Sequence, residues 1–159
     1  GPADASSNLA GAIKDDLLAV DESLEGHVIV CGYGLVGERV VDILLEHRVK
    51  VVVIEIDSAK VQALIERGVD VIKGDATSSK VLRDAGVERA KAIAIVMDDD
   101  AKNLFSIITA KDLNDKIIIA TRANDEGMIE RFKDAGAAFI ATPAKSASDE
   151  LFKELSKGL

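Results

Sequence analysis

The stretch His27-Val28-Ile29-Val30-Cys31-Gly32-Tyr33-Gly34-Leu35-Val36-Gly37 is an apolar segment that ends in the pattern G-x-G-x-x-G. A helical pattern follows, and a second apolar segment delivers Glu55 18 positions after the last glycine. In a dinucleotide site the first glycine permits a tight turn, and the second lets backbone approach a pyrophosphate. The third allows close helix–strand packing, and an acid about 20 residues later binds ribose. We therefore expect phosphate contacts along Gly32 to Gly37 and a ribose contact at Glu55.

Apolar strand-like segments alternate with helical segments along the rest of the chain. Runs such as Val51 to Ile54 and Ile117 to Ile119 are continuously apolar, which is typical of parallel strands covered on both faces. The sequence predicts an α/β fold, a Rossmann-like doubly wound six-stranded parallel sheet in a single domain over residues 27–142. Strands are expected at 27–31, 50–56, 70–73, 92–97, 116–120 and 138–141, and helices at 35–47, 58–67, 78–85, 99–113, 125–135 and 143–156.

Composition narrows the class of protein. The net charge of −8 argues against nucleic acid as a partner and offers no basic patch for a lipid surface. No apolar run approaches the roughly 20 residues of a membrane span, so we expect no membrane insertion. The single cysteine, Cys31, cannot form an internal disulfide, and a cytoplasmic location is the simplest interpretation. Residues 1–26 are expected to be a flexible linker, with apolar spacing for a short helix over 13–24.

Ligands of such a sheet bind beyond the carboxyl ends of its strands, so the residues there are candidates for contacts. Glu55 and Ile56 end the second strand, and Glu55 is either a ribose ligand or a solvated strand end. Its carboxylate repels a 2′-phosphate, so NAD-like or plain adenosine ligands fit better than NADP. Asp75 and Ala76 follow the third strand, where they either line an adenine pocket or form a turn before the next helix.

The fourth and fifth strands also deliver charged residues to this edge. Asp98, Asp99 and Asp100 are consecutive, whereas the oxygen ligands of a cation must converge from several directions. We therefore favour a helix cap with first-turn acids over a metal site. Arg122 follows the fifth strand and either reaches a phosphate or pairs with a nearby acid.

Residues suited to catalysis are scarce in the pattern. His27 precedes a strand and His47 ends a helix, so we expect neither at the ligand edge. Cys31, at a strand end, is more typical of a buried small hydrophobe than of a nucleophile. No Cys/His cluster has metal-site spacing. We expect a site that binds rather than reacts, with no catalytic residue and no metal.

Six motifs, taken in order, resemble those of one known family: V-I-V-C-G-Y-G-L-V-G, V-V-V-I-E-I-D-S, G-D-A-T, M-D-D-D with Asn103 after it, I-I-A-T-R-A and D-A-G-A. The chain from His27 to about Leu151 is similar to the N-terminal lobe of the RCK domain, also called TrkA-N or KTN. The resemblance implies phosphate contacts at Gly32, Gly34 and Gly37, and an adenine pocket at Asp75 and Ala76. It makes residues 143–159 a crossover helix toward a C-terminal lobe that this sequence lacks.

The resemblance also implies a function: a cytoplasmic regulatory domain that senses a nucleotide and gates a potassium channel or transporter. The implied ligands are NAD or NADH, alternatively ATP, ADP or AMP. The implied partners are a second copy in a homodimer, an octameric gating ring and a membrane subunit, which places the domain at the cytoplasmic face of the cell membrane. Leu35 stands where many members carry arginine, which weakens the case for a triphosphate. An NAD-dependent oxidoreductase fragment and an interaction module with an empty cleft remain alternatives.

Overall fold

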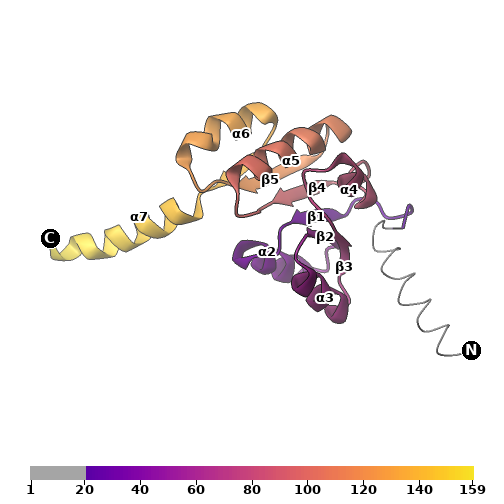
Figure 1. Cartoon of the computed structure of the whole chain (residues 1–159). Coiled ribbons are helices and arrows are strands. Elements are labelled where there is room, and N and C mark those ends of the chain that lie inside the picture. Colours follow the sequence, from indigo (N-terminus) through magenta and orange to yellow (C-terminus); the bar gives the residue numbers. More distant parts are fainter. Residues whose placement is uncertain (1–20) are drawn as a thin grey trace, which may run out of the picture.

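A computed structural model describes residues 21–159 as one parallel sheet flanked by helices (Figure 1). Its six strands run in the order β3-β2-β1-β4-β5-β6, and every pairing is parallel. The chain therefore winds outward from β1 to β3 and then from β4 to β6, which confirms the predicted doubly wound fold. The strands are β1 (Val28–Cys31), β2 (Val51–Glu55), β3 (Asp70–Lys73), β4 (Ala92–Ile95), β5 (Ile118–Arg122) and β6 (Phe139–Ala141).

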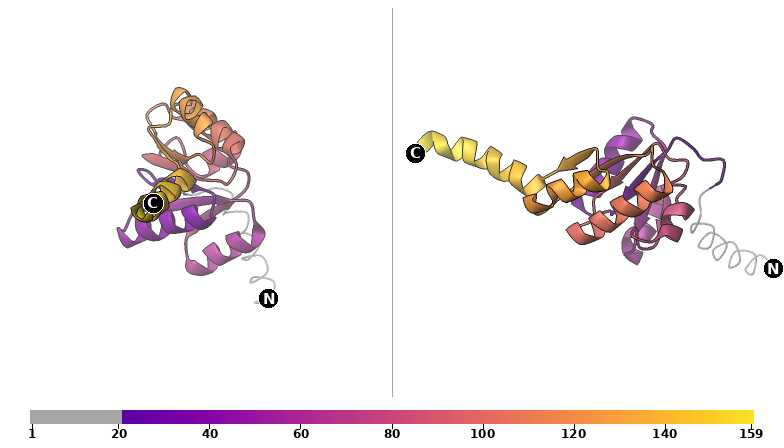
Figure 2. Two further views of the ribbon diagram at one scale, coloured as in Figure 1. Left: turned by 90° about the vertical axis from the view of Figure 1, so that its left-hand side faces the viewer. Right: turned by 90° about the horizontal axis from the view of Figure 1, so that it is seen from above.

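Helices cover the two faces unequally. The helices are α2 (Leu35–Glu46), α3 (Ser58–Arg67), α4 (Ser79–Asp84), α5 (Asp100–Leu113), α6 (Ile129–Ala135) and α7 (Pro143–Leu155), with short 3₁₀ turns at Glu126–Met128 and Ser156–Gly158. Figure 1 shows α2 and α3 on one face and α4, α5 and α6 on the other. Helix α7 projects away from the body in Figure 1 and in the right-hand view of Figure 2. None of the helices that the structure describes is long and apolar enough to cross a bilayer.

The core consists of aliphatic side chains on both sides of the central strands. All residues of β1 and β2 are buried. One face packs Ile29 and Ile93 against Phe132 and other residues of the α4–α6 layer, while the opposite face packs Val53 against the α2–α3 layer. Burial of these apolar side chains supplies the main favourable term in folding.

Side-chain caps set where several helices begin. The carboxylate of Asp57 accepts hydrogen bonds from the backbone N–H groups of Ala59 and Lys60, as expected for a helix starting at Ser58. Asp99 accepts from Lys102 at the start of α5, which confirms the cap interpretation of the acidic run. The first turns of these helices are therefore fixed locally, close to the carboxyl edge of the sheet.

The structure corrects several predicted boundaries. Strand β4 ends at Ile95 rather than residue 97, because the side chain of Asn103 takes both backbone groups of Met97. Strand β5 spans Ile118–Arg122 rather than 116–120, since a turn at Asn114 precedes it and β6 pairs with it as far as Arg122. A 3₁₀ turn replaces the first part of the predicted helix over 125–135. The predicted helix over 13–24 lies mostly outside the described residues, and residues 21–24 are not helical.

One face of the β5–β6 half is less covered than the sequence predicts. Ile118 belongs to a continuous apolar run, yet its side chain is 61% exposed, and Phe139 of β6 is 66% exposed. Helix α7 does not return over these strands but points away from them (Figure 1). The prediction that strands are buried on both faces is therefore confirmed for β1 and β2, and it is wrong for Ile118 in β5.

Candidate functional site

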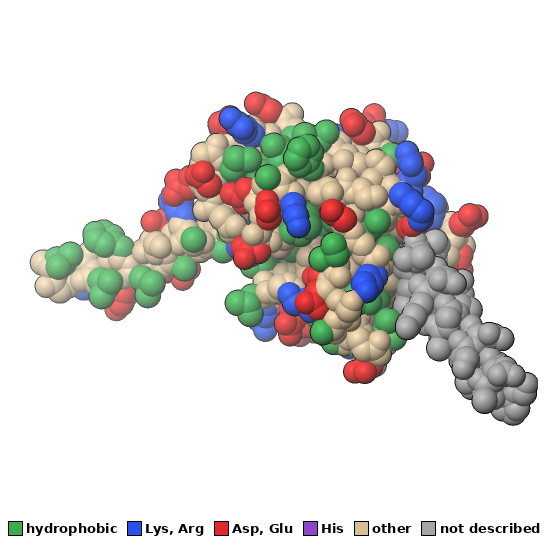
Figure 3. All heavy atoms as spheres, viewed as in Figure 1, with side chains coloured by type: hydrophobic (Ala, Val, Ile, Leu, Met, Phe, Trp, Pro, Cys, Tyr) green, Lys and Arg blue, Asp and Glu red, His purple; other side chains and the backbone are tan. Residues whose placement is uncertain are grey.

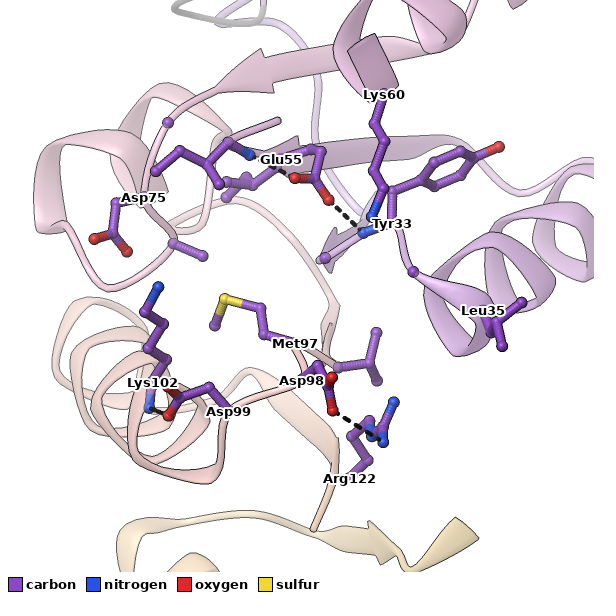
Figure 4. Close-up of a pocket in the computed structure, with 17 residues that line it drawn as sticks. Tyr33, Leu35, Glu55, Lys60, Asp75, Met97, Asp98, Asp99, Lys102 and Arg122 are labelled. Carbon is purple, nitrogen blue, oxygen red and sulfur yellow. Dashed lines mark hydrogen bonds and ion pairs between the residues drawn. The ribbon is translucent and has the colours of Figure 1, made fainter. Parts of the chain in front are cut away.

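A cleft of about 610 Å³ lies at the carboxyl edge of the sheet (Figure 4). It sits where the strand order reverses between β1 and β4, which is the usual place for a ligand in an open α/β sheet. Its lining comes from the loops after five strands and from the first turns of α3 and α5. The lining residues are Gly32–Leu35, Ile54–Ile56, Lys60, Gly74–Ala76, Val96–Asp99, Lys102 and Arg122.

The glycine loop has the geometry that its pattern predicts. Gly32 has φ of +99°, a conformation that side chains disfavour. A Cβ on Gly37 would lie 1.9 Å from the carbonyl oxygen of Gly32, so only glycine allows the helix to approach the strand this closely. A Cβ on Gly34 would meet nothing within 4 Å and would point into open space. The loop therefore leaves backbone at Gly34 accessible beside the N-terminus of α2, where backbone N–H groups favour an anion.

Glu55 is buried and bound to the backbone on both of its oxygens. It is 8% exposed. Its Oε1 accepts a hydrogen bond from Tyr33 N at 2.8 Å, and its Oε2 accepts from Ile56 N and Asp57 N, each at 2.8 Å. The interpretation of Glu55 as a solvated strand end is therefore wrong. The carboxylate connects the glycine loop to the end of β2, and its contact with ribose stays a prediction.

The side chain of Tyr33 links the glycine loop to the helices beneath it. Arg67 Nη1 donates to Tyr33 Oη at 2.9 Å, and Arg67 Nη2 lies 2.7 Å from Asp42 Oδ1. These residues come from the loop, the end of α3 and the middle of α2. Tyr33 is thus held at its backbone by Glu55 and at its phenol by Arg67, so the loop is fixed from two sides.

Asp75 and Ala76 form the turn after β3 at one end of the cleft. Asp75 Oδ1 accepts from the backbone N–H and the hydroxyl of Thr77, at 2.9 and 2.8 Å. The Thr77 N–H, then its hydroxyl, lower the pKa of Asp75, so this carboxyl is ionised at neutral pH. Ser78 caps α4 through Val81 N. The turn and the helix cap are both present. Asp75 and Ala76 also line the cleft, and their contact with adenine stays a prediction.

The three consecutive acids after β4 have separate structural roles. Asp99 caps α5, and the two oxygens of Asp100 accept from Asn124 N and Asp125 N at 2.8 and 2.9 Å. Asp98 lies 3.7 Å from Arg122 Nη2, and its side chain is 90% exposed. Asn124 also donates to Asp98 through its Nδ2, so Asp98 and Asp100 share this partner while Asp99 caps the helix. Among the described residues, these carboxylates form no cluster that could hold a metal ion.

Arg122 occupies the opposite end of the cleft from Asp75 (Figure 4). Its Nη2 donates to Asn124 Oδ1 at 2.7 Å and pairs loosely with Asp98. Its Nε is buried and has no hydrogen-bond partner among the described residues. Arg122 therefore pairs with Asp98, and its Nε remains available to donate to an anion. The phosphate contact stays a prediction.

Asn103 holds together two walls of the cleft. It is fully buried. Its Nδ2 donates to the carbonyl oxygens of Met97 and Arg122 at 2.9 and 3.2 Å, while its Oδ1 accepts from Met97 N at 3.1 Å. One side chain from α5 therefore sets the spacing between the ends of β4 and β5.

The cleft brings together the predicted site residues from the loops after β1 to β5, with two exceptions. Val36 packs in the core and Gly37 contacts the Gly32 carbonyl, so neither lines the cleft. Sequence reasoning missed Lys60 and Lys102, which enter from the first turns of α3 and α5. Their position in the sequence could have identified them, because the first helical turn after a parallel strand lies at the ligand-binding edge of the sheet.

The fold and the glycine-loop cleft define a Rossmann-like α/β domain of the doubly wound class. Residues 28–143 match the model of the TrkA-N domain. The chain belongs to the TrkA-N family, which confirms the resemblance found in the sequence. No catalytic role follows from this membership.

The relatives include proteins of potassium transport. The chain is 32% identical over 125 residues to the probable potassium channel protein 2 of Methanocaldococcus jannaschii, covering 77% of this chain and 36% of that protein. It is 29% identical to the voltage-gated potassium channel Kch of Escherichia coli, covering 82% of this chain and 32% of the channel. The chain thus spans about a third of the length of these relatives.

Solved structures share the fold. The TrkA-N domain of the inner membrane protein ybaL from Escherichia coli superposes with a TM-score of 0.79 at 25% identity, covering 84% of this chain and 98% of that domain. The GsuK channel bound to NAD has a TM-score of 0.72 at 21% identity, covering 78% of this chain and 22% of the channel. At this identity, the similarity to GsuK concerns the fold alone.

Proposed function

We propose that this domain is a non-enzymatic nucleotide sensor that regulates a potassium channel or transporter at the cytoplasmic face of the cell membrane. One observation carries the proposal: a TrkA-N chain holds an accessible glycine loop and a buried, backbone-bound Glu55 around a single cleft. The named relatives are potassium channels, and GsuK has been solved with NAD and with ADP.

The residues present fit an adenine nucleotide with a diphosphate. Gly34 and the N-terminus of α2 would face the phosphates, and the unpartnered Nε of Arg122 would add a charged donor. Glu55 would accept from a ribose hydroxyl, since its Oε1 has a single N–H donor in the structure and can accept another hydrogen bond. NAD or NADH is the ligand we favour, with ATP, ADP and AMP as alternatives.

Regulation needs two conformations with different affinities for the ligand. Glu55 bonds the glycine loop, and Arg122 bonds Asn124, which precedes α6. A nucleotide that contacts both would bias the spacing between the two halves of the sheet. We propose that a dimer, assembled into an octameric gating ring, transmits this bias to the membrane subunit.

The test is isothermal titration of this chain, stripped of co-purified nucleotide, with NAD, NADH, NADPH, ATP, ADP and AMP. Micromolar binding that is selective among these ligands would support a sensor and identify its signal. A folded, ligand-free sample that binds none of them would overturn the proposal and favour the interaction module with an empty cleft.

A matched pair of variants separates the glycine loop from general effects. Gly34→Asp adds a side chain and a negative charge where phosphate would lie, and should abolish binding with the fold retained. Gly158→Asp makes the same change at a position with equally open space that does not line the cleft, and should bind as the parent does. Unchanged affinity in Gly34→Asp would remove the glycine loop from the site.

A further inference from the structure

Lys102 and Asp75 face one another across one end of the cleft. Lys102 lies in the first turn of α5 and Asp75 in the turn after β3. Figure 4 shows the side chain of Lys102 extending from α5 toward Asp75. Among residues 21–159 the ammonium of Lys102 has no ion-pair partner within 4.0 Å. The ammonium of Lys102 and the carboxylate of Asp75 thus border the same space without forming an ion pair across it.

The backbone beneath Lys102 is fixed on both sides. Asp99 Oδ1 accepts from Lys102 N at 3.0 Å. The next residue, Asn103, is fully buried and bound to Met97 and Arg122. Only the side chain of Lys102 is free to move, so its ammonium can reach a ligand at this end of the cleft without a change in the backbone.

Asp75 presents one free oxygen to the same space. Its Oδ1 is taken by the N–H and hydroxyl of Thr77, and its Oδ2 has no partner among the described residues. The turn is anchored below by Ser106 Oγ, which donates to the carbonyl oxygen of Ala76 at 2.7 Å. Bonds to Thr77 keep Asp75 ionised, and the positive charge of Lys102 adds to this effect on its pKa. The cleft end therefore offers one fixed acceptor and one mobile donor.

Adenine has the complementary pair of groups on one edge. Its exocyclic amine donates, and the ring nitrogens on either side of that amine, N1 and N7, accept. We propose that Lys102 is a base-binding residue of the nucleotide site. Its ammonium donates a hydrogen bond to N1 or N7 of adenine, while Asp75 accepts a hydrogen bond from the exocyclic amine. This inference rests on the proposed function and adds a contact that the glycine-loop pattern does not predict.

The test compares Lys102→Met with the parent chain for four ligands: AMP, 1-deaza-AMP, 7-deaza-AMP and 3-deaza-AMP. A charge-assisted hydrogen bond is worth about tenfold or more in affinity. Lys102→Met should lower the affinity for AMP and for 3-deaza-AMP by about this factor. For the analogue that lacks the contacted nitrogen, either 1-deaza-AMP or 7-deaza-AMP, the affinity should change little. Lys60→Met removes the same charge from another part of the cleft, and its effect should be equal for all four ligands.

The outcomes separate this inference from the proposed function. If the parent binds AMP and Lys102→Met weakens all four ligands equally, Lys102 acts through its charge alone and the base contact is overturned. A loss that disappears only with 3-deaza-AMP overturns it too, because N3 is not beside the amine. If the parent binds none of the four AMP ligands nor any ligand of the titration above, the proposed function fails and this inference fails with it.

Discussion

At the scale of the residue, Gly34 and Gly37 belong to one motif and have opposite environments. We predict that Gly37→Ala destabilises the fold by roughly 3 kcal/mol, because its Cβ would lie 1.9 Å from the Gly32 carbonyl oxygen and force α2 away from β1. Gly34→Ala, with nothing within 4 Å of its Cβ, should stay within about 1 kcal/mol of the parent. Urea unfolding of both variants measures the difference. Equal stabilities would contradict the packing role assigned to Gly37.

The pKa of Asp75 provides a second test at this scale. Thr77 lowers it through its N–H and then its hydroxyl. Because the folded-state pKa lies below the ordinary value, the stabilisation is present at neutral pH and is lost as pH falls through the folded-state pKa. Thr77→Val keeps the N–H and removes the hydroxyl, so it should raise the pKa of Asp75 only part of the way toward its ordinary value, whereas Thr77→Ser should leave it low. Carboxyl ¹³C NMR titration measures all three proteins, and an unshifted Thr77→Val would show that the hydroxyl contributes nothing.

Residues of the site could be predicted from the sequence only where they belong to a known motif. The spacing of Gly32, Gly34 and Glu55 is a known signature, and these residues do meet at one cleft. Lys60 and Lys102 carry no such signature, because a lysine in a first helical turn is ordinary on any solvent-facing surface. The hydrogen bonds from Ile56 N and Asp57 N to Glu55 also depend on the path of the chain after β2, which residue type does not encode.

At the scale of the element, the side chain of Asn103 determines where β4 ends. We predict that Asn103→Ala destabilises the domain by about 3 kcal/mol, since it leaves buried backbone groups of Met97 and Arg122 without partners. Asp112→Ala, an exposed change on the same helix, should have little effect. Chemical denaturation gives both values. A cost for Asn103→Ala below about 1 kcal/mol would mean that water replaces the lost bonds.

Elements with local signals were predicted closely, and those set by tertiary contacts were not. Helix α3 begins at Ser58 as expected, because Asp57 caps it within the same segment. The end of β4 depends on Asn103, which lies on the following helix, and no pattern within Ala92 to Met97 reveals it. The exposure of Ile118 has the same kind of cause, since it depends on where α7 points.

At the scale of the whole molecule, two halves of a sheet meet at the cleft, and a helix extends from one of them. Arg122 and Asp98 belong to the β4–β6 half, while Glu55 and Asp75 belong to the β1–β3 half. The glycine loop, after β1, adjoins both halves. A nucleotide that spans the cleft therefore contacts both, and α7 is joined to the second half through β6. We therefore expect nucleotide binding to change the position of α7.

Helix α7 is the surface on which we expect copies of the chain to associate. Leu151, Phe152 and Leu155 are 64%, 62% and 69% exposed, and Figure 3 shows hydrophobic side chains along the projecting helix. Each such side chain gains about 1.5–3 kcal/mol when fully buried, so a helix that presents three of them favours a partner. We predict concentration-dependent dimerisation in sedimentation equilibrium. Replacing Leu151, Phe152 and Leu155 together with serine should leave a monomer.

The matched control changes polar residues of the same helix, Glu150→Ser with Lys153→Ser, and should dimerise as the parent does. Both sets of substitutions leave the sheet untouched, and urea unfolding of each variant shows whether the domain remains folded. A parent chain that stays monomeric at millimolar concentration would contradict association through α7. The apolar face would then need a different partner, and the coupling from the cleft to α7 would act on that partner instead of on a second copy.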